Sequence, residues 1–463
     1  MKDHCGVYGI YSYDSDSLAK MVYYGLFALQ HRGQESAGIA VADGKDIKVH
    51  KGMGLCAVVF NEESLSGLNG GHIASGHVRY STTGSSSIEN AQPLVVDSKY
   101  GPIALSHNGN IVNSDELREE LKSEGYAFKG SSDSEVMAVM IARSKAPTVE
   151  EAIIEMCNKS HGAFSLIIMT RDKLIALRDP NGLRPLCMGK LNNLYIISSE
   201  TAALDVLGAN FVRDVTNGEM VIVDEKGVRS NIYAPRAKKA LCAFEFIYLA
   251  RPDSRLDGRS VYDARVTMGK YLAKAHRVDA DIVIGVPDSG ISAAIGYAQE
   301  SKIPFAEGLI KNRYIGRTFI QPSQAIRDLG VKLKLNPIRS VVRGKKVVVI
   351  DDSIVRGTTS RQIVRILRDA GAREVHMRVS SPPILFPCFY GIDTPSRSEL
   401  IASSMSVESV GKFLEADSLA YLTIRDLVES INLPKGSLCL ACLNGGYCVE
   451  LPEKLKNLNL IFK

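Results

Sequence analysis

The sequence has no run that approaches the roughly 18 consecutive apolar residues of a transmembrane helix, so we do not expect a membrane-spanning protein. Its first residues show neither the apolar core of a secretory signal nor an Arg- and Ser-rich transit segment. We therefore expect a cytoplasmic protein. The nine cysteines, in the absence of a secretory signal, argue against a disulfide framework and favour free thiols or metal ligands.

Long blocks of one charge are also missing. The formal net charge is only +5, which does not indicate a nucleic-acid-binding protein but suits a small polyanionic substrate. Neither G-x-x-x-x-G-K-[ST] nor G-x-G-x-x-G occurs, which excludes a Walker A loop and a dinucleotide fingerprint. With 463 residues, 45% hydrophobic and 23% charged, the composition is that of a globular protein of about two or three domains.

The two halves of the chain differ in their hydrophobic pattern. In the first half, short strand-like segments mix with helical stretches such as 115–124 and 134–144. In the second half, continuous apolar strands alternate with helices, which predicts a parallel sheet covered on both faces. We place a first domain at 5–235, a second at 236–430 and an appended tail rich in Leu, Gly and Cys at 431–463.

The segment VVVIDDSIVRGTTS, residues 347–360, carries the most informative pattern. Asp351 and Asp352 follow a buried strand, at the end where open α/β sheets bind ligands. A glycine and three hydroxyl residues then lead into a helix, where backbone N–H groups form a cradle for an anion. The carboxylates would repel that anion, so they should face sugar hydroxyls or Mg²⁺, and the pattern indicates a ribose 5-phosphate. An acidic strand end with an ordinary helix cap is the structural alternative.

This segment closely resembles the PRPP-binding motif of the type I phosphoribosyltransferases. The resemblance implies that Asp351 and Asp352 hold the ribose hydroxyls and Mg²⁺. Around the 5′-phosphate it places Ser353, Arg356, Gly357, Thr358 and Thr359.

Two further segments carry candidate contacts to the pyrophosphate of the same substrate. GVPDSG resembles the pyrophosphate-side loop of this family, which places Asp288 and Ser289 near Mg²⁺. KNRYIGRTFIQP, residues 311–322, alternates cations and aromatics around a glycine, a pattern that suits a lid closing over a polyanion. Lys311 and Arg313 are its candidate ligands of the pyrophosphate; a solvated surface segment is the alternative.

Several turns of the first half carry polar residues that could together form a second site. Each has an ordinary alternative, because Asn-Gly favours a tight turn, Asp133 can cap a helix, and Cys5 can be a buried residue of a first strand. Together they supply a cation for a carboxylate, a carboxylate for an ammonium, an oxyanion hole and a thiol nucleophile. The residues are Cys5, Arg32, Arg79, Tyr80, Thr82, Asn108, Gly109 and Asp133.

This combination resembles the N-terminal-nucleophile glutaminase domain of the class II glutamine amidotransferases, an α+β fold with αββα layers. The resemblance implies that residues 1–4 are a propeptide and that Cys5 begins the mature chain. A free α-amine with a pKa of about 8 can then serve as the base for its own thiol. The resemblance also assigns the substrate contacts: Arg79 for the α-carboxylate, Asp133 for the α-ammonium, Asn108 with Gly109 for the oxyanion, and Arg32, Tyr80 and Thr82 for glutamine.

The tail contains a C-x-x-C pair, Cys439 and Cys442, which by itself indicates zinc, a redox pair or no function. In the iron–sulfur members of the glutamine PRPP amidotransferases, a matching pair joins a cysteine before an RPDS segment and one within PCFYGID. The resemblance implies that here Cys242 and Cys388 complete a [4Fe–4S] site. Tetrahedral zinc is the second possibility, and Cys448 is a surplus thiol nearby.

The motifs lie in the order of the iron–sulfur glutamine PRPP amidotransferases (amidophosphoribosyltransferases) along essentially the whole chain. This resemblance implies a pentosyltransferase that takes ammonia from glutamine and makes 5-phosphoribosylamine, glutamate and pyrophosphate, the first committed step of purine synthesis. It also implies feedback inhibition by purine nucleotides and a homotetramer. A catalytically silent PRPP-binding regulator and an amidotransferase with another acceptor are the alternatives.

Overall fold

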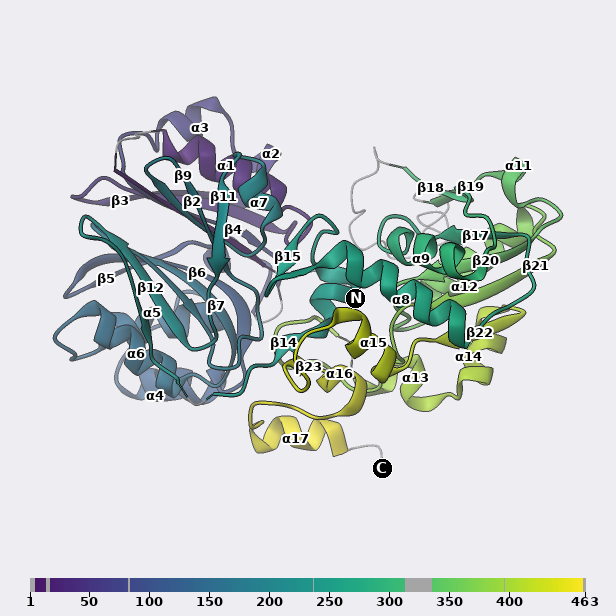
Figure 1. Ribbon diagram of the computed structural model, residues 1–463. Coiled ribbons are helices and arrows are strands. Elements are labelled where there is room, and N and C mark those ends of the chain that lie inside the picture. Colours follow the sequence, from purple (N-terminus) through teal and green to yellow (C-terminus); the bar gives the residue numbers. More distant parts are fainter. Residues whose placement is uncertain are drawn as a thin grey trace.

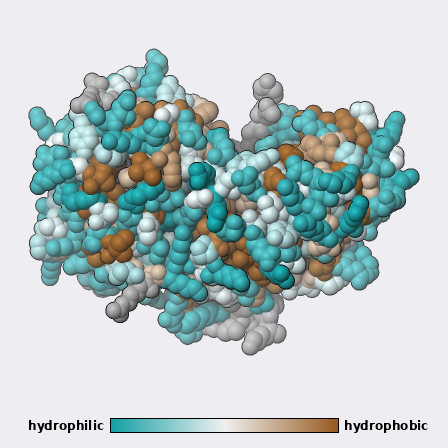
Figure 2. All heavy atoms as spheres, in the orientation of Figure 1, coloured by the Kyte–Doolittle hydropathy of each residue, from teal (hydrophilic) through white to brown (hydrophobic). Residues whose placement is uncertain are grey.

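The computed structural model describes residues 5–13, 17–81, 84–235, 237–312, 335–394 and 396–460. The chain forms two lobes (Figure 1): the first half lies in one, the second half in the other, and the C-terminal tail lies below their junction. In the described residues no helix combines the length and the apolar character needed to cross a membrane. Hydrophilic residues cover most of the face in Figure 2, with apolar residues in separate groups over both lobes.

The first lobe contains two stacked sheets. One has the order β11-β9-β10-β1-β4-β2-β3 and the other β13-β12-β8-β7-β6-β5. The strands of the first sheet are β1 (Gly6–Ser12), β2 (Ser36–Ala42), β3 (Ile47–Met53), β4 (Ile73–Arg79), β9 (Cys187–Leu191), β10 (Leu194–Ser198) and β11 (Asn210–Asp214). Those of the second are β5 (Leu94–Ser98), β6 (Gly101–Ile111), β7 (Gly162–Met169), β8 (Leu174–Arg178), β12 (Glu219–Asp224) and β13 (Gly227–Ile232).

Helices cover the outer face of each sheet. The first sheet carries α1 (Leu18–Ala28), α2 (Cys56–Val59), α3 (Glu62–Ser66) and α7 (Ala202–Asp205), and the second carries α4 (Ser114–Ser123), α5 (Asp133–Arg143) and α6 (Val149–Lys159); η1 (Ile88–Asn90) is a short turn. Strand β1 is buried along its whole length because Tyr8 packs under the helices while Val7 packs against the other sheet. The αββα sandwich predicted for the first domain is confirmed.

The second lobe is built on a parallel sheet of order β17-β20-β21-β22. Its strands are β17 (Ile282–Gly285), β20 (Lys346–Asp351), β21 (Glu374–Val379) and β22 (Ser418–Tyr421), and its longer helices are α8 (Val261–Ala275), α9 (Ile291–Ser301), α12 (Thr358–Asp369), α14 (Val407–Leu414) and α15 (Ile424–Ile431). Val348 packs into the core beside α8, α9 and α15, whereas its neighbour Val349 packs into the core beside α12 and α14. Both faces are thus covered, as predicted.

Short elements complete the second lobe and join it to the tail. They are η2 (Glu245–Leu249), β15 (Arg255–Leu256), β16 (Arg259–Ser260), β18 (Leu309–Lys311), β19 (Leu335–Pro337), α11 (Arg339–Val342), η3 (Arg397–Glu399), α13 (Ile401–Ser404), α16 (Ala441–Asn444) and α17 (Glu453–Leu460). The tail strand β23 (Leu438–Cys439) pairs in parallel with β14 (Leu241–Cys242). The tail is therefore anchored to the stretch that follows the sandwich. The predicted limits at 235 and 430 stay predictions.

Candidate active sites

Cys5 lies immediately before β1 and faces the interior of the first lobe. Its thiol is buried and donates a hydrogen bond to the carbonyl oxygen of Tyr80 at 3.4 Å. Burial raises the pKa of this thiol, and the nearby Asp133 and Glu35 act in the same direction, although backbone hydrogen bonding at Tyr80 and the charge of Arg79 lower it. The thiol is therefore held in its neutral form and requires a base before it can act as a nucleophile.

A small pocket opens at Cys5. Its volume of about 10 Å³ is room for roughly one water molecule, so a glutamine side chain requires its walls to move apart. Five predicted residues line it together: Cys5, Arg79, Tyr80, Gly109 and Asp133. Four other residues, which were not predicted from the sequence, also line the pocket: Gln92, His107, Ser132 and Ser134. His107 directly precedes the Asn-Gly pair, and that position is the signal that could have drawn attention to it.

Asn108 and Gly109 lie on β6 beside this pocket. Asn108 is fully buried, and neither its side-chain nitrogen nor its side-chain oxygen has a hydrogen-bond partner among the described residues. Gly109 has a φ of +154°, and a Cβ placed there would lie 2.0 Å from the carbonyl oxygen of Ala163. A buried amide without a partner is costly, and it suits a site where a ligand oxygen completes the hydrogen bond.

Asp133 is the first residue of α5, where its charge is favoured by the helix dipole. Its carboxylate accepts hydrogen bonds from the backbone N–H of Ile111 at 3.1 Å and of Ser134 at 2.9 Å. His107 Nδ1 lies 3.7 Å from the same carboxylate, and burial lowers the pKa of His107. Arg79 donates to the Ser85 carbonyl at 3.1 Å. The negative Asp133 and the positive Arg79 therefore face one pocket, as the binding of an amino acid requires.

Arg32 does not line the pocket. Its guanidinium is fully buried, pairs with Glu200 and donates to both carboxylate oxygens of Glu245 at 3.0 and 2.8 Å. Its Nε donates to the carbonyl oxygen of Cys5 at 3.0 Å. The geometry thus shows Arg32 holding the backbone of Cys5, while the sequence predicted a contact to glutamine. Thr82, the other predicted contact, lies outside the described residues.

The second site forms where β20 ends. Asp351 and Asp352 are both buried, and the hydroxyls of Ser289 and Ser353 donate to the Asp352 carboxylate. Burial raises the pKa of both carboxyl groups, and the proximity of Asp352 raises that of Asp351 further. The structure therefore brings together the predicted oxygen ligands Ser289, Asp351 and Asp352.

The predicted anion cradle follows directly after these carboxylates. Gly357 has a φ of +75° and caps α12, and Thr358 and Thr359 form its first turn. The guanidinium of Arg356 pairs with Glu399 at 3.1 Å. Nearby in the fold, Lys311 Nζ lies 2.6 Å from the carboxylate of Asp288, so the two predicted pyrophosphate contacts meet each other. Arg313 and the rest of the proposed lid to residue 322 lie outside the described residues.

The four tail and junction cysteines lie in one region. The pairing of β14 with β23 places Cys242 opposite Cys439, and Cys242, Cys442 and Cys388 share one apolar cluster. Burial raises the pKa of the Cys442 thiol, and the thiols of Cys388, Cys242 and Cys439 raise it further. The fifth thiol, Cys448, is hydrogen-bonded to Cys439. Within the described ranges, however, no three or more His, Cys, Asp or Glu side chains lie close enough together to hold a metal ion.

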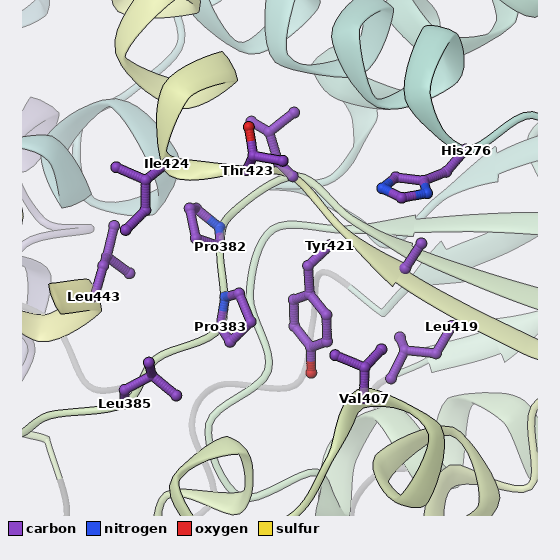
Figure 3. Close-up of a pocket in the computed structure, with 12 residues that line it drawn as sticks. His276, Pro382, Pro383, Leu385, Val407, Leu419, Tyr421, Thr423, Ile424 and Leu443 are labelled. Atoms are coloured by element: carbon purple, nitrogen blue, oxygen red, sulfur yellow. The ribbon is translucent and has the colours of Figure 1, made fainter.

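A separate cavity of about 390 Å³ lies in the second lobe, beside the edge strand β22 (Figure 3). Its walls are mainly apolar and include Pro382, Pro383, Leu419 and Tyr421. The cavity shares no lining residue with the pocket at Cys5 and includes neither Asp351 nor Asp352. We therefore assign no step of the chemistry to it.

Comparison with known domain families defines the class. Residues 77–206 match the glutamine amidotransferase domain and residues 266–381 match the phosphoribosyl transferase domain. The chain thus joins a glutamine amidotransferase to a phosphoribosyltransferase, in the order in which its two sites occur. This class agrees with the two lobes and with the site that each contains.

Full-length relatives narrow the class to one family. The amidophosphoribosyltransferase of Synechococcus elongatus is 50% identical, over all of this chain and 94% of its own. That of Methanocaldococcus jannaschii is 51% identical, over 96% of this chain and 98% of its own. The structure of glutamine PRPP amidotransferase from B. subtilis, complexed with ADP and GMP, is 49% identical with a TM-score of 0.91 and covers 97% of this chain and 98% of its own. The chain belongs to the amidophosphoribosyltransferase family.

Proposed function

We propose that this chain hydrolyses glutamine at Cys5 and joins the released ammonia to C1 of PRPP, giving 5-phosphoribosylamine, glutamate and pyrophosphate. Membership of the amidophosphoribosyltransferase family supports the reaction. The observation that supports the roles of the residues is the buried, unpartnered Asn108 amide next to a pocket that contains a neutral thiol. A catalytically silent PRPP-binding regulator would not need a thiol and an unpartnered amide beside the same pocket.

In the glutaminase site, removal of residues 1–4 frees the α-amine of Cys5. The amine takes the thiol proton, and the thiolate attacks the carboxamide carbon of glutamine. The side-chain nitrogen of Asn108 and the N–H of Gly109 stabilise the resulting oxyanion, while Arg79 and Asp133 hold the α-carboxylate and α-ammonium. The proton returns to the leaving nitrogen, NH₃ departs, and water then hydrolyses the thioester to glutamate.

In the transferase site, the carboxylates of Asp351 and Asp352 bind the ribose hydroxyls of PRPP. Residues Ser353, Arg356, Gly357, Thr358 and Thr359 hold the 5′-phosphate, and Lys311 reaches the pyrophosphate. Buried carboxylate and hydroxyl oxygens are the ligands that Mg²⁺ prefers, and when bound with Ser289, Asp351 and Asp352 this ion would neutralise the leaving pyrophosphate. Ammonia must arrive unprotonated to attack C1, which requires an apolar passage between the sites.

The assay of both products decides between this function and its alternatives. Glutamine, PRPP and Mg²⁺ together should release glutamate and pyrophosphate in equal amounts, and omission of PRPP should slow glutamate release. Cys5→Ser should stop product formation from glutamine but leave pyrophosphate release with ammonium salts intact. A regulator releases neither product, and an amidotransferase with another acceptor releases no pyrophosphate.

The thiols of Cys242, Cys388, Cys439 and Cys442 are proposed ligands of a [4Fe–4S] cluster, which would tie the tail to the junction of the lobes. Their number and their placement support this donor set, because Cys242, Cys388 and Cys442 belong to one cluster and Cys439 pairs with Cys242. Anaerobically purified protein should contain about four iron and four labile sulfide per chain. Cys442→Ser should lose the iron while Cys448→Ser keeps it. Zinc without sulfide would point to the second possibility, and the reverse behaviour of the two variants would refute the ligand assignment.

Feedback inhibition by purine nucleotides and assembly as a homotetramer are also proposed. The B. subtilis relative was solved with ADP and GMP, which supports nucleotide binding by this chain. A nucleotide 5′-phosphate can use the same cradle at Gly357–Thr359 as PRPP. Inhibition that weakens as PRPP is raised, and a sedimentation mass four times that of the chain, are the expected results. Inhibition that is independent of PRPP would place the nucleotide elsewhere.

A further inference from the structure

Gly391 of the transferase half approaches Gly109 of the glutaminase half across the junction of the lobes. A Cβ at position 391 would lie 2.9 Å from the carbonyl carbon of Gly109, 3.0 Å from its oxygen and 3.2 Å from Nη2 of Arg184. Gly391 also has a φ of +99°, a conformation that other residues rarely adopt. Glycine is therefore required at position 391 for two independent reasons, and one of them is the proximity of the proposed oxyanion site.

The residues before Gly391 are attached to both lobes and to the tail. The side-chain nitrogen of Asn110 donates to the carbonyl oxygen of Phe389 at 2.9 Å, and Arg184 donates to the carbonyl oxygen of Tyr390. The hydroxyl of Tyr390 donates to the carbonyl oxygen of Val449 in the tail at 3.1 Å. Hydrogen bonds to the first lobe and to the tail thus hold the segment Phe389–Gly391 in place. Its last residue lies against β6 at Gly109, one of the two proposed oxyanion residues.

We propose that the segment Phe389–Gly391 positions the oxyanion hole. The inference rests on the proposed roles of Asn108 and Gly109. A Cβ at position 391 would push the backbone of Gly109 away, and a shift of that backbone would also move the N–H of Gly109 and the adjoining Asn108. A misplacement of about 1 Å can cost about 100-fold in rate. The glutaminase site is therefore completed by a segment of the transferase half, and ammonia release depends on the correct docking of the two lobes.

Gly391→Ala tests the proposal, with Gly227→Ala as the matched control. Gly227 has a similar φ of +104°, but a Cβ there would meet nothing within 4 Å. Gly391→Ala should lower kcat for glutamine by about 10- to 100-fold, with KM for glutamine and ammonia-dependent synthesis close to those of Gly227→Ala. Alkylation of Cys5 by iodoacetamide forms no oxyanion, so its rate should be unchanged.

The alkylation measurement separates this positioning role from general damage and from failure of the proposed function. A kcat for glutamine in Gly391→Ala within twofold of that in Gly227→Ala would overturn the proposal. It would also be overturned if the rate of Cys5 alkylation and the rate of ammonia-dependent synthesis fell together with kcat in Gly391→Ala. If Gly391→Ala does not fold, Asn110→Ala replaces it, because this variant removes the hydrogen bond to Phe389. A lower kcat for glutamine with an unchanged rate of Cys5 alkylation supports the positioning role, and an unchanged kcat refutes it. If alkylation of the unaltered protein leaves glutamine hydrolysis intact, Cys5 itself is not the nucleophile.

Discussion

The thiol of Cys5 lies in surroundings that keep it protonated. Burial dominates, and the nearby carboxylates of Asp133 and Glu35 add to the cost of a thiolate. No separate base is needed if the α-amine of the same residue is free, because that amine titrates at about pH 8. The chemistry at Cys5 therefore depends on whether residues 1–4 have been removed and on which groups donate hydrogen bonds to the oxyanion.

The amide of Asn108 has no partner among the described residues, so its loss should be felt mainly in the transition state. Asn108→Ala should lower kcat for glutamine hydrolysis by about 10²- to 10³-fold with little change in KM. Ammonia-dependent synthesis, measured with the same protein, should be preserved because that reaction bypasses the glutaminase site. An equal loss of both activities would argue against an oxyanion role.

His77 makes the first lobe sensitive to acid. Its Nε2 donates to the carbonyl oxygen of His107 at 2.9 Å, and burial lowers the pKa of His77 to about 3. The unfolded chain takes up this proton near pH 6.5 while the folded chain does not, so the free energy of unfolding should fall as the pH drops from about 6.5 towards 3. The expected slope is about 1.4 kcal/mol per pH unit.

Urea unfolding at several pH values checks this slope. His77→Gln should remove the contribution, and His161→Gln, at an exposed position, should leave it in place. An acid dependence that is the same in all three proteins would show that His77 does not cause it.

At the scale of single elements, strands and turns with strong local patterns were predictable. The segment KVVVID forms β20, and Asp351 and Asp352 lie at its carboxyl end as predicted. A parallel strand that is buried on both faces leaves few other positions for carboxylates. The role of Arg32 was not predictable in the same way. Its partners Glu200 and Glu245 lie 168 and 213 residues away in the chain, and no local pattern encodes such a contact.

The turn from β20 into α12 allows a test of the anion cradle. Gly357→Ala forces a Cβ to within 2.9 Å of Ile401 at a φ of +75° and should turn the backbone N–H groups away from the phosphate. KM for PRPP in ammonia-dependent synthesis should rise by about 10- to 100-fold, the loss of hydrogen bonds to a charged group. Gly344→Ala, at a φ of +72° with nothing within 4 Å of its Cβ, should leave KM unchanged. Equal effects would indicate backbone strain alone.

For the whole molecule, buried charges join the two halves. Arg32 of the first half pairs with Glu245 of the second, and Arg178 pairs with Asp257 at 2.8 Å. Arg32→Met leaves Glu200 and Glu245 without their main cation and should cost about 3–5 kcal/mol of the free energy of unfolding. Lys412→Met, which breaks an exposed pair with Glu408, should change little. Denaturant unfolding measures the free energy of unfolding of both variants. A small effect of Arg32→Met would show that His31 and Arg184 are enough to compensate the charges of Glu200 and Glu245.

The arrangement of two lobes around a shared junction was only partly predictable. Hydrophobic patterns and motifs identified both domains and most of the pocket, since Arg79, Gly109 and Asp133 meet at Cys5. The contact between Gly109 and Gly391 was not predictable, because the two glycines lie 282 positions apart in the chain and their only signal is the absence of a side chain. Contacts across the junction depend on how the two folded lobes pack together, and no local pattern in a single sequence encodes that packing.

The proposed glutaminase chemistry depends most directly on the state of the N-terminus in active protein. Intact-mass and N-terminal sequencing of a preparation with full glutamine-dependent activity should find chains that begin at Cys5 and lack Met1 to His4. Full glutamine-dependent activity in chains that retain those four residues would contradict it.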